Sequence, residues 1–184
     1  MEIRTFSLDI PEIVMIEPGL AEDERGYLFE AWNEDQFFTA VGDFGAFVQD
    51  NQSRSRRGVV RGLHYQLPNP QGKLVRAIAG SVFSVGVDLR RDSPTFGGWA
   101  GAVLSAASRN QLWLPPGFAH GFLALDEGTE ILYKMTDYYR PGCERTLRWD
   151  DPEIGIDWPL NELTPIVSDR DRLAPALADA AVYD

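Results

Sequence analysis

Cysteine and long apolar runs are almost absent from this chain of 184 residues. Cys143 is the only cysteine, so no disulfide can form within the chain. Because secreted proteins commonly depend on disulfides, this composition favours the cytoplasm, and the absence of an apolar signal region after Met1–Thr5 agrees with that location. No apolar run approaches the roughly 20 residues that span a bilayer, which excludes a transmembrane helix.

Positive charge is also scarce. The chain has 17 lysines and arginines against 28 aspartates and glutamates, a net charge of −11. Such an acidic chain is not expected to bind nucleic acid or an anionic membrane surface. A small anionic ligand stays compatible with the sequence, because a pocket responds to local charge. Basic residues beside glycines and aromatics are therefore candidate ligand contacts: Arg25, Arg61, Lys73 and Arg76.

The length predicts one domain, residues 1–184, and the pattern predicts that it is mainly β. Glycine and proline divide the chain into many short segments that alternate or are rich in β-branched and aromatic residues, as in a sandwich or barrel. Helix is sparse. Asn33 has the features of an N-cap for a short helix through Phe37 and Phe38, and the alanine-rich segment 174–181 indicates a second helix.

Only two histidines occur, and each lies in a motif with turn signals. His64 ends the run Arg61–His64, and His120 ends the run Pro115–His120. Histidine is the side chain best suited to move a proton near neutral pH. Two histidines without a His-x-His pair make a poor transition-metal site, so we expect no metal and no other cofactor.

Strand alternation decides where these side chains point. A regular strand would turn Arg61 and His64 to opposite faces, but a bulge at Gly62 would bring both to one cavity. Gln49 and Asn51 share a face of their strand, which points either to solvent or into a barrel. The apolar residues on both sides of so many segments favour the barrel interior.

Pro115–His120 contains the pattern Pro-x-Gly-x-x-His, typical of the cupin-type double-stranded β-helix, a jelly-roll barrel. Further motifs occur in an order and at spacings that resemble the dTDP-4-dehydrorhamnose 3,5-epimerase family. The resemblance covers about residues 10–171 and depends on these segments: Asp23–Glu30, Val48–Asn51, Val60–Gln66, Gln71–Arg76, Ser93–Gly97, Gln111–Trp113, Gly117–Phe122 and Tyr133–Lys134.

The resemblance implies a metal-free isomerase that converts dTDP-4-dehydro-6-deoxy-D-glucose to dTDP-4-dehydro-L-rhamnose. The C4 ketone acidifies the hydrogens at C3 and C5. A base removes such a proton, an enolate forms, and an acid returns a proton to the opposite face. The resemblance also implies a homodimer with exchanged strands.

Site residues follow from the same match. His64 corresponds to the base, Asp171 to the carboxylate that orients it, and Tyr133 to the opposing acid, because a tyrosine hydroxyl holds its proton at neutral pH. Lys73 and His120 correspond to contacts near the sugar, and Lys73 is a donor to the C4 oxyanion. The remaining positions correspond to nucleotide and pyrophosphate contacts, some of them from the neighbouring subunit: Arg25, Glu30, Gln49, Asp50, Asn51, Arg61, Tyr139, Glu144 and Arg170.

Three positions depart from the family pattern. Gln52 replaces a common histidine, Ser84 stands where an aspartate that could pair with His120 is common, and Arg170 replaces a lysine. These changes fit a relative that acts on a different keto-sugar or at one carbon only, and three alternatives stay open beside the 3,5-epimerase. They are a single-carbon epimerase or keto-isomerase of a related dTDP-deoxysugar, a non-catalytic cupin that binds nucleotide sugars, and a metal-dependent cupin oxygenase, which the histidine count disfavours.

Overall fold

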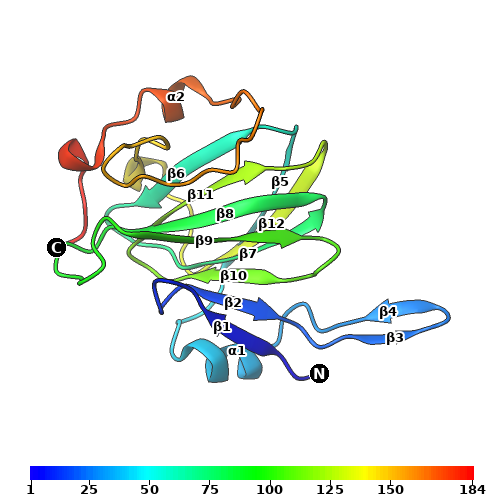
Figure 1. Ribbon diagram of the computed structural model, residues 1–184. Coiled ribbons are helices and arrows are strands. Elements are labelled where there is room, and N and C mark those ends of the chain that lie inside the picture. Colours follow the sequence, from blue (N-terminus) through cyan, green and yellow to red (C-terminus); the bar gives the residue numbers. More distant parts are fainter.

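The computed structural model describes residues 1–184, and β-strands dominate it (Figure 1). The longer helix, α1 (Glu34–Val41), has eight residues, and α2 (Asp169–Arg172) has four, so neither is long enough to cross a membrane. The strands are β1 (Arg4–Ser7), β2 (Val14–Glu17), β3 (Ala21–Asp23), β4 (Gly26–Leu28), β5 (Gln49–Ser55), β6 (Val60–Gln66), β7 (Lys73–Ala79), β8 (Ser81–Asp88), β9 (Trp99–Ser105), β10 (Gln111–Leu114), β11 (Phe118–Ala124), β12 (Thr129–Met135) and β13 (Glu144–Thr146).

Two antiparallel sheets face each other and form the jelly-roll barrel that the sequence predicts. The six-stranded sheet has the order β1-β2-β10-β7-β12-β5, and the five-stranded sheet has the order β13-β6-β11-β8-β9. Strands β3 and β4 form a separate ribbon that extends away from the barrel (Figure 1). The carboxyl-terminal segment with α2 crosses the outer side of the five-stranded sheet (Figure 1).

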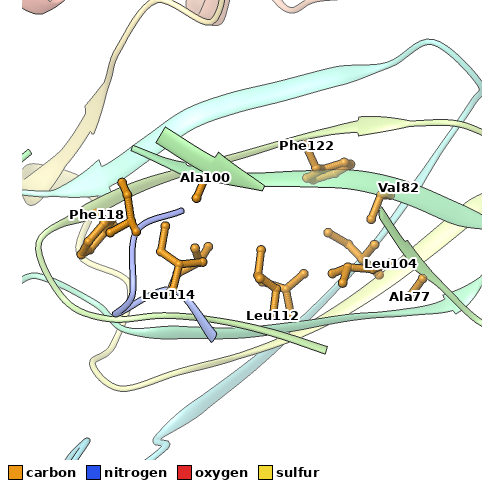
Figure 2. Close-up of a cluster of buried hydrophobic side chains, with 12 residues drawn as sticks. Ala77, Val82, Ala100, Leu104, Leu112, Leu114, Phe118 and Phe122 are labelled. Carbon is orange, nitrogen blue, oxygen red and sulfur yellow. The ribbon is translucent and has the colours of Figure 1, made fainter. Parts of the chain in front are cut away.

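The core between the sheets follows from strand alternation. Every second side chain of a strand points inward, and the inward residues form a cluster of 12 buried hydrophobic side chains, several of which Figure 2 shows. Leu112 and Phe122 are among them, from opposite sheets. A second cluster lies between the five-stranded sheet and the carboxyl-terminal segment, and a third packs α1 through Phe37 against Trp113.

The helix predicted after Asn33 is confirmed, since the Asn33 Oδ1 atom accepts a hydrogen bond from the Gln36 N–H at 3.2 Å. The helix predicted over residues 174–181 is wrong, because that segment forms only the 3-10 turn Leu177–Asp179. Its backbone is bonded elsewhere: the Leu177 N–H donates to an Asp151 carboxylate oxygen at 2.7 Å. Tertiary contacts therefore outweigh the helix propensity of the alanines.

Candidate functional site

One end of the barrel interior is polar. Lys73 shares the inward face of β7 with Val75 and Ala77, and Tyr133 shares the inward face of β12 with Ile131. A pocket of about 300 Å³ opens where these polar side chains replace the apolar core. Its lining residues are Gln49, Asn51, Arg61, His64, Tyr65, Gln66, Gln71, Lys73, His120, Phe122, Tyr133, Met135, Tyr139 and Glu144.

The two histidines are cross-strand neighbours. His64 on β6 pairs directly with His120 on β11, so both rings project from the same face into the pocket. The register slips after this pair, because Phe122 is opposite Arg61 and β6 has one residue more than β11 in this interval. This is the predicted bulge, and it brings Arg61 and His64 to one pocket.

Gly62 makes the bulge sterically possible. Its φ is +122°, and a Cβ atom there would lie 2.7 Å from both the Gly121 Cα and the His120 carbonyl oxygen. No other residue fits a backbone in this conformation at this distance. The same bulge directs the Gly62 N–H toward Asp171, whose Oδ2 atom accepts it at 3.2 Å.

Asp171 comes from α2 and holds His64 from outside the pocket. The His64 Nε2 and Asp171 Oδ1 atoms are 2.8 Å apart, and Asp171 is only 3% exposed. Burial by itself would raise the pKa of Asp171, but the hydrogen bonds from His64 and Gly62, and the charge of Arg170, hold that pKa below its ordinary value. An ionised carboxylate only accepts hydrogen bonds, so the His64 Nε2–H group donates to Asp171 and the Nδ1 atom is the one left free of Asp171.

Arg170 forms part of the rim beside this dyad. Its Nη1 atom donates to Glu144 Oε2 at 2.7 Å, and the Tyr139 hydroxyl donates to the same oxygen at 2.8 Å. Its Nη2 atom lies 3.0 Å from His64 Nε2. Because a guanidinium only donates, it cannot bond to a protonated Nε2, so Glu144 is its main partner. Burial would raise the pKa of Glu144, but Tyr139 and Arg170 keep it lowered.

Lys73 is a buried cation on the opposite sheet from His64. It is 6% exposed, and its Nζ atom donates to the His64 carbonyl oxygen at 3.0 Å. It forms no salt bridge, and burial lowers its pKa to about 8, although the charge of Glu144 opposes this shift. A pKa in this range leaves Lys73 mostly charged at neutral pH, and burial strengthens its action on a nearby oxyanion.

His120 completes the inner end of the pocket. Its Nε2 atom lies 3.1 Å from the Ser84 hydroxyl, and its ring centroid lies 6.3 Å from that of Tyr133. Burial above all, and then the charges of Lys73 and His64, lower the pKa of His120 well below its ordinary value. His120 is therefore an uncharged imidazole at neutral pH.

Most of the predicted site residues line this pocket, and five do not. Asp171 and Arg170 contact His64 from behind. Arg25 is at the exposed tip of the β3–β4 ribbon, bonded to Asp23. Glu30 binds the amino-terminal ammonium at 2.6 Å. Asp50 faces away from the pocket and pairs with Lys134 at 3.0 Å. No three histidine, cysteine, aspartate or glutamate side chains come together as a metal-ligand group.

Two supporting glutamines, Gln66 and Gln71, are not among the predicted site residues. Gln66 accepts a hydrogen bond from the Arg140 N–H at 2.6 Å and donates to the Tyr138 carbonyl oxygen at 3.2 Å, while Gln71 donates to Asp137 at 2.8 Å. Together they hold the loop that presents Tyr139 to the pocket. Their position next to His64 and Lys73 in the motifs was the available signal. Gln52, by contrast, points outward and donates to Glu130.

Comparisons with known proteins identify the family. The model of the dTDP-4-dehydrorhamnose 3,5-epimerase family matches residues 7–179. A Pseudomonas aeruginosa dTDP-4-dehydrorhamnose 3,5-epimerase is 54% identical over 181 residues, which cover 98% of this chain and 99% of that protein.

Solved structures extend the likeness to the fold. The dTDP-6-deoxy-D-glucose-3,5-epimerase of Legionella pneumophila, in complex with dTDP-4-keto-L-rhamnose, matches with a TM-score of 0.94 at 44% identity, covering 98% of this chain and 95% of that one. A 3'-monoepimerase from Streptomyces bikiniensis, in complex with dTDP-quinovose, matches with a TM-score of 0.86 at 34% identity, covering 97% and 88%. Sequence and fold thus agree that this chain belongs to the dTDP-4-dehydrorhamnose 3,5-epimerase family.

Proposed function

We propose that this chain is an isomerase that epimerises dTDP-4-dehydro-6-deoxy-D-glucose at C3 and C5, yielding dTDP-4-dehydro-L-rhamnose. The observation that carries the proposal is the arrangement of a base and an acid on opposite walls of one pocket. His64 belongs to the five-stranded sheet, and Tyr133 belongs to the six-stranded sheet. Inversion of a carbon centre requires that a proton leave from one face and another arrive at the opposite face.

Each epimerisation is a pair of proton transfers. His64 Nδ1 takes the proton from the carbon, and the electron pair of the broken C–H bond moves into the C4 ketone as an enolate. The Tyr133 hydroxyl then gives its proton to the same carbon from the other face, and the enolate collapses back to the ketone. Asp171 stabilises the imidazolium that forms on His64. No bond order or oxidation state changes overall, so the reaction needs no redox partner.

Lys73 and His120 are the proposed donors to the C4 oxygen. Both are nearly enclosed by protein, and a hydrogen bond to a developing oxyanion is strongest where water is excluded. Lys73 contributes positive charge, and His120 contributes an uncharged N–H. The two donors come from different sheets, so together they define where the oxygen sits.

The polar rim of the pocket suits the nucleotide diphosphate. Arg61 is suited to the pyrophosphate, because a guanidinium matches phosphate oxygens in pairs. Tyr139 offers an exposed ring, and the other proposed contacts around it are Gln49, Asn51, Glu144 and Arg170.

We further propose a cytoplasmic homodimer that exchanges strands, with residues 1–184 of each subunit as one domain. All six residues of β3 and β4 are exposed, Leu28 at 67%. A lone two-stranded ribbon with an exposed apolar tip gains little stability by itself. Arg25 lies on this ribbon outside its own pocket, so it contacts a nucleotide only by reaching a partner's pocket; the same holds for Glu30 and Asp50 as nucleotide contacts.

A single-carbon epimerase is the second candidate. The likeness to the 3'-monoepimerase favours it as an alternative, and Ser84 changes the surroundings of His120 without affecting His64, Tyr133 or Lys73. Both activities remove a proton from a carbon beside the C4 ketone, so they differ in how many carbons exchange.

Proton exchange with solvent tests the proposal directly. Incubation of the 4-keto nucleotide sugar with the protein in heavy water is expected to place deuterium at both C3 and C5, as read by NMR and mass spectrometry of the product. Deuterium at one carbon alone would establish the second candidate. Exchange at neither carbon would leave only a binding function.

Two substitutions separate the base from the acid. His64→Ala is expected to lower exchange by roughly 10²–10⁴-fold, because the base is lost. Tyr133→Phe is expected to exchange protons still but to form little inverted product. Gln52→Ala, on β5 but outside the pocket, is the control and should behave as the unmodified protein. Normal turnover in His64→Ala, or normal inversion in Tyr133→Phe, contradicts the assignment.

The buried cation predicts an alkaline limit to activity. Lys73 has a lowered pKa of about 8, so its charged form is present below that pH and is lost as the pH rises through it. The pH profile of kcat/KM is therefore expected to fall above about 8. Lys73→Met should be weakly active at all pH values and lack this limb. A wild-type profile that stays flat to about pH 10 is incompatible with a catalytic ammonium.

Mixed dimers test strand exchange. Co-expressed Arg25→Ala and His64→Ala chains are expected to recover activity that neither variant has alone, because a mixed dimer holds one pocket with an intact His64 and the partner's intact Arg25. The matched control is His64→Ala with Tyr133→Phe. These two residues belong to the same pocket, so every pocket stays defective. Equal activity for the two mixtures argues against the exchange.

A further inference from the structure

Ser84 lies inside the barrel, next to a histidine. It belongs to β8, is fully enclosed, and shares the inward face of that strand with Val82. Its hydroxyl has a single hydrogen-bond contact, the Nε2 atom of His120 at 3.1 Å. No carboxylate forms a hydrogen bond or salt bridge with His120.

Two arrangements of protons are compatible with one hydrogen bond between a serine and an imidazole. If His120 carried its proton on Nε2, it would donate to Ser84, and the buried hydroxyl proton would have no acceptor. An unpaired buried donor is unfavourable. If the Ser84 hydroxyl donates to Nε2 instead, both groups are satisfied, and the ring proton lies on Nδ1.

The Nδ1 atom of His120 is open to the pocket. It has no hydrogen-bond partner in the chain, yet it is not enclosed by protein atoms, since only Gln36 Oε1 and Ser53 Oγ are buried without a partner. His120 also lines the pocket described above. A proton on Nδ1 is thus available to a ligand.

We propose that Ser84 is a positioning residue that fixes His120 as a neutral imidazole with its proton on Nδ1, and that this N–H donates to a sugar oxygen in the pocket. The identity of the acceptor rests on the proposed function, whereas the protonation of the ring does not. The titratable groups that face His120 are Lys73 on β7, His64 on β6 and Tyr133 on β12, and Glu144 is the one carboxylate that lines the same pocket. No carboxylate contacts the His120 ring, and the charge of Lys73 disfavours a charged imidazole.

A neutral donor has a chemical consequence for an enolate. A cationic imidazole readily gives up its proton, and protonation of the oxygen would trap the enol. A neutral imidazole N–H is a far weaker acid, so it holds the oxygen without protonating it. The negative charge stays available for return of the proton to carbon. Lys73 then stabilises the enolate oxygen by its charge, and the His120 N–H fixes the position of that oxygen.

Nitrogen NMR of the ring tests this protonation state. The chain has two histidines, so ¹⁵N-histidine labelling gives four ring nitrogens, and His64→Ala identifies the His64 signals by their loss. The His120 signals are expected to show a protonated Nδ1 and an unprotonated Nε2, unchanged between about pH 6 and 8. A proton on Nε2, or a ring that becomes cationic in that range, overturns the proposal. The protonation state is read on the unmodified protein, and His64→Ala serves only to assign the signals.

Variants of Ser84 test its part in the arrangement. Ser84→Ala removes the donor to Nε2, so the His120 proton is expected to move toward Nε2 and kcat to fall about tenfold with little change in KM, as for one weakened uncharged hydrogen bond. Ser84→Thr keeps the hydroxyl and should keep the Nδ1 proton. Ser81→Ala is the control, because Ser81 lies on the same strand but bonds to Asp126.

The two proposals fail in distinguishable ways. An unchanged His120 spectrum in folded Ser84→Ala refutes the role of Ser84, whatever the activity of the enzyme. If Nδ1 is protonated in the unmodified protein and the proton moves to Nε2 in Ser84→Ala, an unchanged kcat in that variant refutes the donor role of His120. If the spectrum is as expected but the sugar exchanges no protons, the proposed function fails and the Ser84–His120 arrangement stands.

Discussion

Strands β6 and β11 approach so closely at Gly62 and Gly121 that no side chain fits between them, and the site depends on this contact. The approach forces the extra residue of β6 into a bulge. The bulge turns Arg61 inward and aims the Gly62 N–H at Asp171. It also keeps His64 directly opposite His120. One backbone constraint thus sets the positions of His64, Asp171 and His120 relative to one another.

The site also requires two opposite walls around one pocket, and the two sheets of the barrel provide them. An apolar core from both sheets fills most of the interior and holds the sheets at a fixed separation. The polar residues occupy the remaining end, where burying Lys73 and His120 is unfavourable and must be offset by that core. The unfavourable burial has a use, because it leaves a lysine that titrates near neutral pH and a histidine that stays uncharged.

Much of the fold could be predicted from local pattern. Alternating segments correctly indicate most strands of the two sheets, since each strand has one face in the core. The alanine-rich end has a tertiary cause: it becomes a docked segment because its backbone bonds to the Asp151 side chain. That partner is not visible in the local sequence.

The residues of the candidate site that belong to short motifs could be predicted from the sequence. His64, Lys73, His120 and Tyr133 stand in short ordered motifs and do meet in one pocket. Asp171 resembles a solvated acid in its own sequence context, and only the family resemblance selects it. Gln66 and Gln71 lie within the motifs of His64 and Lys73, but their hydrogen-bond partners belong to a distant segment that no local pattern encodes.

The position of Asp171 in the chain also affects when its contact with His64 can form. Synthesis proceeds from the amino end, so all thirteen strands leave the ribosome before α2 does. A nascent barrel can hold His64 in place, yet its imidazole has no carboxylate partner until α2 docks. A chain that stops before residue 171 would therefore keep the strands of the barrel and lack the group that orients His64.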